Sequence, residues 1–300
     1  MQNLPLNLTP MTHYNSRRAR RGFTLIELLV GIVIFAIVGS LFTRMLTVQG
    51  KFYERQGMGN AARNVSRASL NRVVSDFRMI EATGGIVAAT PTSLTIRIPF
   101  AIGVMCGNGV GGTVLTLLPV DSTTYMNSPF VGYAWRNFTN GTYAYVENPA
   151  SKSEGDAVAA AICTGVNVTT VPKGKVVVVA PVLPLNAGLG TPVFLYSRVR
   201  YEFKASAAVP GKLGLYRTTI AANGAENSEE LVAPFANTAS WKFFTLTGGS
   251  VPQTNPPGNL ADIRGLELHL DGISENRAPG MIAEETAPFT TAVFFKNRVQ

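Results

Sequence analysis

The sequence predicts an α+β fold in which a long N-terminal α-helix packs on an antiparallel β-sheet head. Two observations lead to this expectation. An apolar run fills residues 23–43, and short apolar or alternating segments follow residue 85, separated by glycine, proline and asparagine. Strands divided by turn residues, without helical patterns between them, are typical of antiparallel sheets. With 300 residues, the chain is long enough to bury a substantial core.

The apolar run at residues 23–43 carries a single charge, Glu27. A helix of this length spans about 30 Å, the thickness of the hydrocarbon core of a bilayer. Four arginines precede it, at positions 17, 18, 20 and 21, so we expect the amino terminus to stay in the cytoplasm. A secretory signal peptide would have a small-residue cleavage site after a shorter run. Here the small residue, Gly22, comes before the run.

The helix is expected to continue beyond the membrane and to end at Gly84-Gly85. Apolar or small residues recur every three to four positions, which indicates one buried helix face. They are Met58, Ala62, Val65, Ser69, Val73, Phe77 and Ile80. Arginines 63, 67 and 78 fall on a different face. Glycines at positions 50, 57 and 59 each lower helix propensity by about 1 kcal/mol relative to alanine, which favours local melting there.

Eight segments of the head have strand patterns. They are Leu94–Ile98, Thr113–Val120, Lys175–Ala180, Val193–Lys204, Leu213–Thr219, Ser240–Thr247, Ile263–Leu270 and Thr290–Arg298. Residues 101–174 are rich in glycine, asparagine, threonine and serine, and are expected to form a looped insertion.

The net charge of +8 belongs to the first 80 residues, because residues 81–300 hold 15 basic and 15 acidic side chains. This distribution disfavours direct nucleic-acid binding by the head. Two cysteines exclude a disulfide-rich scaffold and a cysteine-rich zinc site, and two histidines cannot make a three-histidine metal centre.

Catalytic motifs are not found in the sequence. Residues 107–112 match G-x-G-x-x-G, but a strand pattern follows them where a dinucleotide site needs a helix, so we expect a hairpin loop. His269 alternates between Leu268 and Leu270 as a strand residue would, and His13 precedes the apolar run. We therefore expect neither an enzyme nor a cofactor. A signal-anchored periplasmic enzyme remains the alternative from another class.

Residues 20–30 read RRGFTLIELLV, which closely resembles the class III signal of type IV prepilins and type II secretion pseudopilins. The resemblance implies that a prepilin peptidase cuts between Gly22 and Phe23 and methylates the new amino group of Phe23. It also places Glu27 at the family's acidic assembly position. A leader of 22 residues is long for this family, and Met11 offers an alternative start with a leader of 12 residues.

Short segments of the head resemble PilW-type minor pilins and pseudopilin J. In order, they are VRYEF at 199–203, GLYR at 214–217, ELV at 230–232, RGLELHL at 264–270 and FFKNR at 294–298. The resemblance implies a pilin-like fold with a leader at 1–22, an assembly helix at 23–43, its amphipathic continuation at 44–83 and a β-rich head at 84–300.

The resemblance also implies a cellular role. Before assembly, the chain would span the bacterial inner membrane once, in contact with lipid and with its head in the periplasm. It would then join a pilus filament at the cell surface, near the tip, to prime assembly or to serve adhesion or DNA uptake. Its partners would be other pilins and minor pilins, the prepilin peptidase and the inner-membrane assembly platform. Pseudopilin J of a type II secretion system is the alternative.

Cys106 and Cys163 both lie in the expected extracytoplasmic head. Paired cysteines are common in such an oxidising compartment. The two are therefore a candidate disulfide, with two separate thiols in loops as the alternative.

Overall fold

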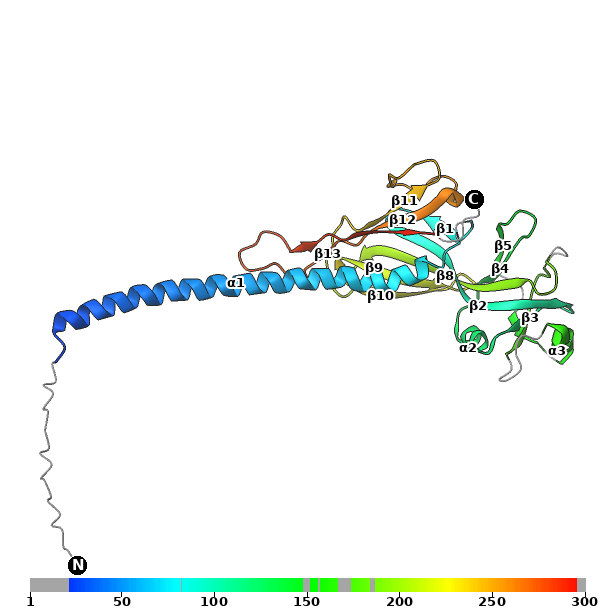
Figure 1. The fold of residues 1–300 in the computed structure, drawn as a ribbon, viewed down its shortest axis with the longest axis horizontal. Helices are drawn as coiled ribbons and strands as arrows, with labels where there is room; N and C mark the ends of the chain where they lie inside the picture. Colours follow the sequence, from blue (N-terminus) through cyan, green and yellow to red (C-terminus); the bar gives the residue numbers. More distant parts are fainter. Residues whose placement is uncertain are drawn as a thin grey trace, which may run out of the picture. The chain divides into compact units, whose positions relative to one another are not determined.

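The computed structural model describes residues 22–81, 83–147, 152–155, 157–166, 174–183 and 187–295. It confirms the α+β, pilin-like fold: a long N-terminal helix is followed by an antiparallel β-sheet head (Figure 1). The chain divides into two compact units, one ending at Phe52 and the other beginning at Tyr53. Helix α1 begins in the first unit and ends in the second.

The helices and strands follow one another along the chain in this order. They are α1 Leu25–Phe77, β1 Ile86–Ala89, β2 Ser93–Gly109, β3 Gly112–Leu117, α2 Pro119–Asn127, β4 Gly132–Arg136, β5 Tyr143–Glu147, β6 Lys152–Glu154, α3 Ala157–Ile162, η1 Cys163–Gly165, β7 Val176–Val179, β8 Pro192–Ala205, β9 Leu213–Ile220, β10 Glu226–Phe235, β11 Ser240–Thr245, η2 Leu260–Asp262, β12 Ile263–His269, β13 Gly272–Ile273, β14 Thr286–Ala287 and β15 Thr290–Phe294.

Helix α1 is continuous over 53 residues, and it includes the glycines at positions 50, 57 and 59. The expectation of local melting at these glycines is therefore wrong. A glycine costs about 1 kcal/mol in a helix, whereas a break would free several backbone hydrogen bonds. The helix ends at Phe77 and not at Gly84-Gly85. The N–H groups of Met79 and Ile80 bond to carbonyl groups three residues back, and Ile80 lies buried in the core.

The part of α1 in the second unit buries the face that the sequence predicts. One further residue is buried there, and two of the predicted residues are less buried than expected. The buried helix residues are Ala62, Ser66, Ser69, Val73 and Phe77. Ser66 was not predicted, and Met58 and Val65 are only half-buried. Small residues on this face permit close approach to the sheet. The N–H of Gly272 donates to Ser66 Oγ at 3.1 Å, and a Cβ on Gly272 would clash with the carbonyl oxygen of Ala62.

The described strands form a twelve-stranded sheet and a three-stranded sheet. The larger follows the order β14-β13-β10-β9-β8-β2-β3-β7-β6, with β1 on β2 and β4 joining β5 to β8. The smaller has the order β11-β12-β15, and all recorded pairings are antiparallel. Strand β8 buries Val193, Leu195, Val199, Tyr201 and Phe203, which confirms the alternation predicted for this segment.

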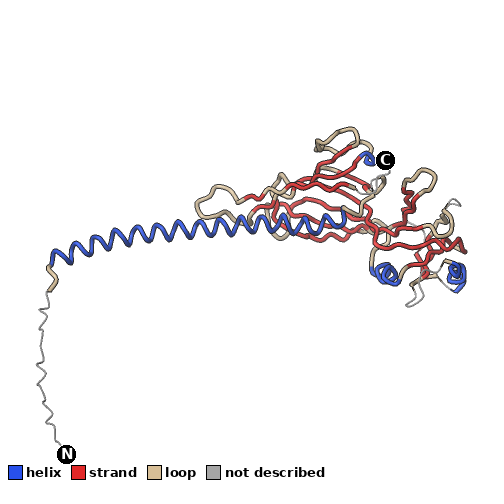
Figure 2. Tube along the Cα trace, in the orientation of Figure 1, coloured by secondary structure: helices blue, strands red, loops and turns tan. Residues whose placement is uncertain are grey.

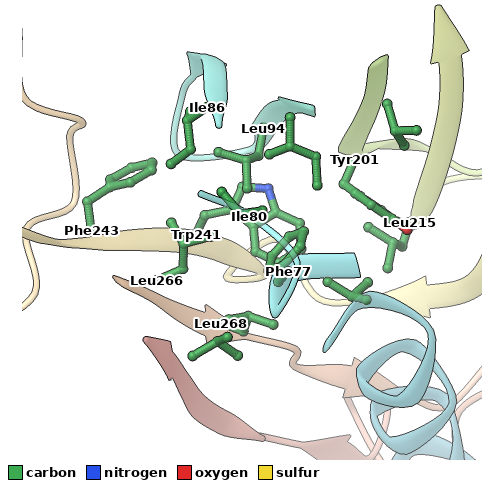
Figure 3. Packing of buried hydrophobic residues seen from close by; sticks show 14 of the residues in the cluster. Phe77, Ile80, Ile86, Leu94, Tyr201, Leu215, Trp241, Phe243, Leu266 and Leu268 are labelled. Atoms are coloured by element: carbon green, nitrogen blue, oxygen red, sulfur yellow. The ribbon is translucent and has the colours of Figure 1, made fainter. Parts of the chain in front are cut away.

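The main core lies between the end of α1 and both sheets. Phe77 of α1 packs edge-on against Tyr201 of β8 at a ring-centroid distance of 5.5 Å and against Trp241 of β11 at 5.6 Å. Figure 3 shows these side chains meeting Ile80 and Leu266 in one cluster. Residues widely separated in the sequence therefore hold the helix end against the head.

The expected looped insertion at residues 101–174 is largely regular structure, which corrects the sequence interpretation. Within it lie most of β2, then β3 to β5, and the two short α-helices of the head (Figure 2). Strand β3 is buried at every position. Its glycine serves close packing, because a Cβ on Gly112 would clash with the carbonyl oxygen of Val179. The predicted strand Thr113–Val120 ends at Leu117, because Pro119 opens α2.

Two other expectations concern the hairpin between β2 and β3 and the end of β15. The glycine-rich motif at 107–112 is a hairpin as predicted, since Gly109 of β2 pairs with Gly112 of β3 and Gly111 has a positive φ of 92°. Strand β15 ends at Phe294. The last residues of the predicted strand, 296–298, lie outside the described residues.

Glu230 of β10 ties this strand of the larger sheet to the turn after β8. Its carboxylate accepts hydrogen bonds from Ser206 Oγ, from Tyr216 Oη at 3.0 Å and from the backbone N–H groups of residues 207 and 208 at 3.0 and 3.2 Å. Burial opposes ionisation, but these hydrogen bonds outweigh it and lower the pKa of the Glu230 carboxyl below its ordinary value.

Acid should therefore weaken the head through Glu230. A lowered pKa stabilises the fold fully above the unfolded value of 4.5, and this contribution is lost as pH falls through the lower folded value. Glu230→Gln should destabilise the chain by about 1.5 kcal/mol at pH 7 and flatten the pH dependence below 4.5. Urea unfolding between pH 3 and 7 measures both effects. Glu229→Gln, at an exposed position of the same strand, is the matched control. Equal pH profiles for wild type and Glu230→Gln would contradict this role.

Candidate functional site

The residues before helix α1 form an accessible segment. Gly22, Phe23 and Thr24 precede the first helical residue, and all three are exposed. A Cβ built on Gly22 would meet no heavy atom within 4 Å. The peptide bond between Gly22 and Phe23 is thus open to an enzyme, and nothing in the described chain requires glycine at position 22. Residues 1–21, with the arginine cluster, His13 and Met11, lie outside the described residues.

Thr24 and Glu27 form a reciprocal capping box at the start of α1. The Thr24 N–H and hydroxyl donate to Glu27 Oε2 at 3.0 and 3.1 Å, and the Glu27 N–H donates to Thr24 Oγ1 at 3.3 Å. These bonds satisfy N–H groups that a helix start leaves free. The Thr-x-x-Glu spacing is the sequence signature of this motif, and it gives Glu27 a capping role that was not expected from the sequence.

The first unit exposes an almost uninterrupted apolar surface. Phe23 and Leu25 are 88% and 83% exposed, and the large apolar residues that follow along the helix to Phe52 are also exposed. An 18-residue window of α1 has a mean hydropathy of 2.7, and none of that window is buried. Within the described residues, α1 is therefore a helix that is both long enough and apolar enough to cross a membrane, judged by length and composition alone.

Three hydroxyl side chains within this apolar surface are satisfied inside the helix. The hydroxyls of Ser40, Thr43 and Thr47 each donate to a backbone carbonyl three or four residues earlier, at 2.8 Å. An unsatisfied polar group in an apolar medium costs several kcal/mol, so this arrangement suits a helix surrounded by lipid or by other apolar helices. Within residues 23–43, Glu27 is the one charged side chain that such a medium must accommodate.

Cys106 and Cys163 are joined by a disulfide in the structure, with Cα atoms 4.9 Å apart. The bridge links β2 to the short helix η1 and lies in a small buried cluster with Val114 and Ala159. The separation along the chain is 57 residues. The bond therefore fixes α3 and η1 onto the sheet within a single head.

Loss of this bond should destabilise the head by about 2–4 kcal/mol, the range expected for closing a loop of this length. The double variant Cys106→Ser and Cys163→Ser should lower the urea midpoint without changing processing of the amino terminus. Wild-type protein treated with a reductant is the matched comparison. Non-reducing peptide mapping that finds free thiols at both positions would contradict the pairing.

No group of three or more histidine, cysteine, aspartate or glutamate side chains within the described residues could hold a metal ion. His269 lies on β12, where Nε2 is 2.5 Å from Glu267 Oε1, and Lys242 on β11 reaches the same oxygen at 3.8 Å. Lys242 and Glu267 form a cross-strand ion pair, and His269 contacts the same carboxylate from its own strand, which explains His269 as part of the sheet surface.

Comparison with known proteins gives one match. Residues 17–43 match the family model described as the prokaryotic N-terminal methylation motif. No curated protein and no solved structure matches the chain. The motif and the exposed apolar helix together support a type IV pilin or pseudopilin-type protein that is anchored in the inner membrane, processed by a prepilin peptidase and assembled with other pilins.

Proposed function

We propose that this chain is a PilW-type minor pilin that polymerises through its N-terminal helix into a type IV pilus. The observation that carries the proposal is the methylation motif at residues 17–43, which overlaps an exposed apolar helix with one carboxylate. The order of the head segments along β8, β9, β10 and β12 supports the PilW type. In this role the head lies in the periplasm before assembly and near the filament tip afterwards, where it primes assembly or serves adhesion or DNA uptake.

The geometry suggests how the amino terminus would work. Cleavage after Gly22 leaves a positive amine at Phe23, about one helical turn from Glu27. The Glu27 carboxylate already faces this end of the helix, because it accepts two hydrogen bonds from Thr24. In an apolar filament core, a carboxylate and an amine attract strongly, so Glu27 of one subunit can pair with the amine of its neighbour. The exposed apolar side chains then pack against neighbouring helices.

Mass spectrometry of the native protein tests the proposal. The expected mature chain begins with N-methylated Phe23 and lacks residues 1–22. An intact leader, or cleavage after residue 43, would contradict it. Detection in sheared pili, together with loss of pili on gene deletion, is the expected cellular result. Intact pili with lost protein secretion would assign the chain to the pseudopilin J role instead.

A further inference from the structure

Strand β15 has one paired edge and one free edge. It lies at the end of the three-stranded sheet and pairs only with β12 among the described strands. The N–H of Leu270 donates to the carbonyl of Phe289, and the N–H of Phe295 donates to the carbonyl of Arg264. In this register, the residues that bond to β12 alternate along β15 and include Thr291 and Val293.

The intervening residues therefore direct their backbone groups away from β12. They are Thr290, Ala292 and Phe294, spaced two apart along the free edge. A row of outward N–H and C=O groups is a template on which another strand can pair. Five residues of extended chain span about 17 Å, enough for a short peptide to form several backbone hydrogen bonds.

A groove runs beside this edge. It has a volume of about 690 Å³ and lies between β15 and the last turns of α1. Its helix wall consists of Leu70, Asn71, Val74, Ser75 and Arg78, and its strand wall of residues 291–294. Leu70 and Val74 are half-buried apolar residues of this wall, and an extended segment in the groove would lie beside them. A strand edge next to a helix wall offers both backbone pairing and side-chain pockets, as peptide recognition by strand addition requires.

The charge of the groove defines the kind of peptide. Arg78 is the single charged side chain in its lining, and it is exposed. It makes no hydrogen bond or ion pair through its guanidinium with the described residues. No acidic side chain is among the described residues that line the groove. An incoming carboxylate would therefore meet an uncompensated positive charge.

We infer that this groove binds an extended peptide segment of a partner protein, which adds to the free edge of β15 and places a carboxylate against Arg78. This function goes beyond assembly through the N-terminal helix, because the contact is made by the head. It does not depend on cleavage at Gly22, so the two proposals can fail separately.

The test uses the full chain in detergent micelles and a displayed library of random ten-residue linear peptides. Selected peptides should carry alternating apolar residues and an aspartate or glutamate, and synthetic copies should bind in fluorescence anisotropy. Ala292→Pro removes an outward N–H while leaving the bonds to β12 in place, and should weaken binding at least about tenfold. Arg78→Glu should also weaken it at least about tenfold. Arg72→Glu, on an exposed helix position outside the groove lining, is the matched control and should change binding less than twofold.

Each other outcome overturns the inference. A library that yields no binding peptide rejects a peptide site. Equal binding by wild type and Ala292→Pro rejects pairing on β15. Binding that appears only after residues 296–300 are deleted would make the chain's own tail the occupant. Concentration-dependent self-association that Ala292→Pro abolishes, without peptide binding, would make a second copy the occupant. Circular dichroism of each variant confirms that the fold is retained.

Discussion

Replacement of Gly22 by valine should abolish removal of the leader and leave the chain as a longer membrane-bound precursor. The reason lies in the enzyme's access to the bond and not in the fold. Gly22 is exposed outside the helix, and an added Cβ there meets no heavy atom of this chain within 4 Å. The variant should therefore fold and insert as wild type does. Immunoblotting of membrane fractions would show the precursor accumulating almost completely.

A matched control separates processing from general damage. Gly31→Val adds the same side chain within the apolar helix, where the added Cβ also meets no neighbouring atom. This variant should lose its leader at the normal rate. Normal processing of Gly22→Val would contradict the proposed cleavage site. Accumulation of precursor in both variants would show that the effect does not belong to position 22.

Glu27→Leu should reduce incorporation into sheared filaments at least tenfold while leaving membrane insertion intact or slightly improved. A buried charge pair that loses one partner typically costs about 3–5 kcal/mol, and about 1.4 kcal/mol corresponds to a factor of ten. Removal of a carboxylate from an apolar helix lowers the cost of insertion, which explains the opposite effect on the membrane step. Quantitative immunoblots of the filament and membrane fractions measure both steps.

Further variants are needed to separate the capping role of Glu27 from its charge, because Glu27→Leu removes both. Glu27→Gln retains a side chain that can cap the helix but removes the charge, and should assemble as poorly as Glu27→Leu. Thr24→Ala keeps the charge and weakens the cap by about 1 kcal/mol, and should assemble nearly as wild type. Normal assembly of Glu27→Gln with failure of Thr24→Ala would assign the role to helix capping.

The spacing of apolar residues along the sequence predicted the buried face of the helix and the alternating burial of a strand. The spacing of Ala62, Ser69, Val73 and Phe77 predicted the buried face of α1, and the alternation along residues 193–204 predicted strand β8. The same spacing correctly included Ile80, which is buried, but it did not predict where α1 ends. The backbone changes to bonds three residues back at Met79 and Ile80 while the buried face continues, so periodicity alone does not mark this boundary.

The insertion shows a different reason for failure. The glycine, asparagine, threonine and serine content of residues 101–174 suggested loops, because such residues are common in turns. In the structure, a Cβ on Gly103 would lie 3.0 Å from Leu117, so this glycine allows two strands and their side chains to pack closely. Which role a glycine has depends on its neighbours across the sheet. At the amino terminus, by contrast, Thr24 and Glu27 form a local pattern that the sequence alone could have revealed.

The internal bonding of Ser40, Thr43 and Thr47 has a consequence for the direction of assembly. These hydroxyls need no partner outside the helix. The helix surface around them is therefore apolar, whether lipid tails or neighbouring helices surround it. The two environments then differ little in free energy for most of its length. If the chain assembles as proposed, transfer of the helix between bilayer and filament would therefore cost little free energy in either direction. The balance would rest on the helix start, where a single pair of opposite charges is made or lost.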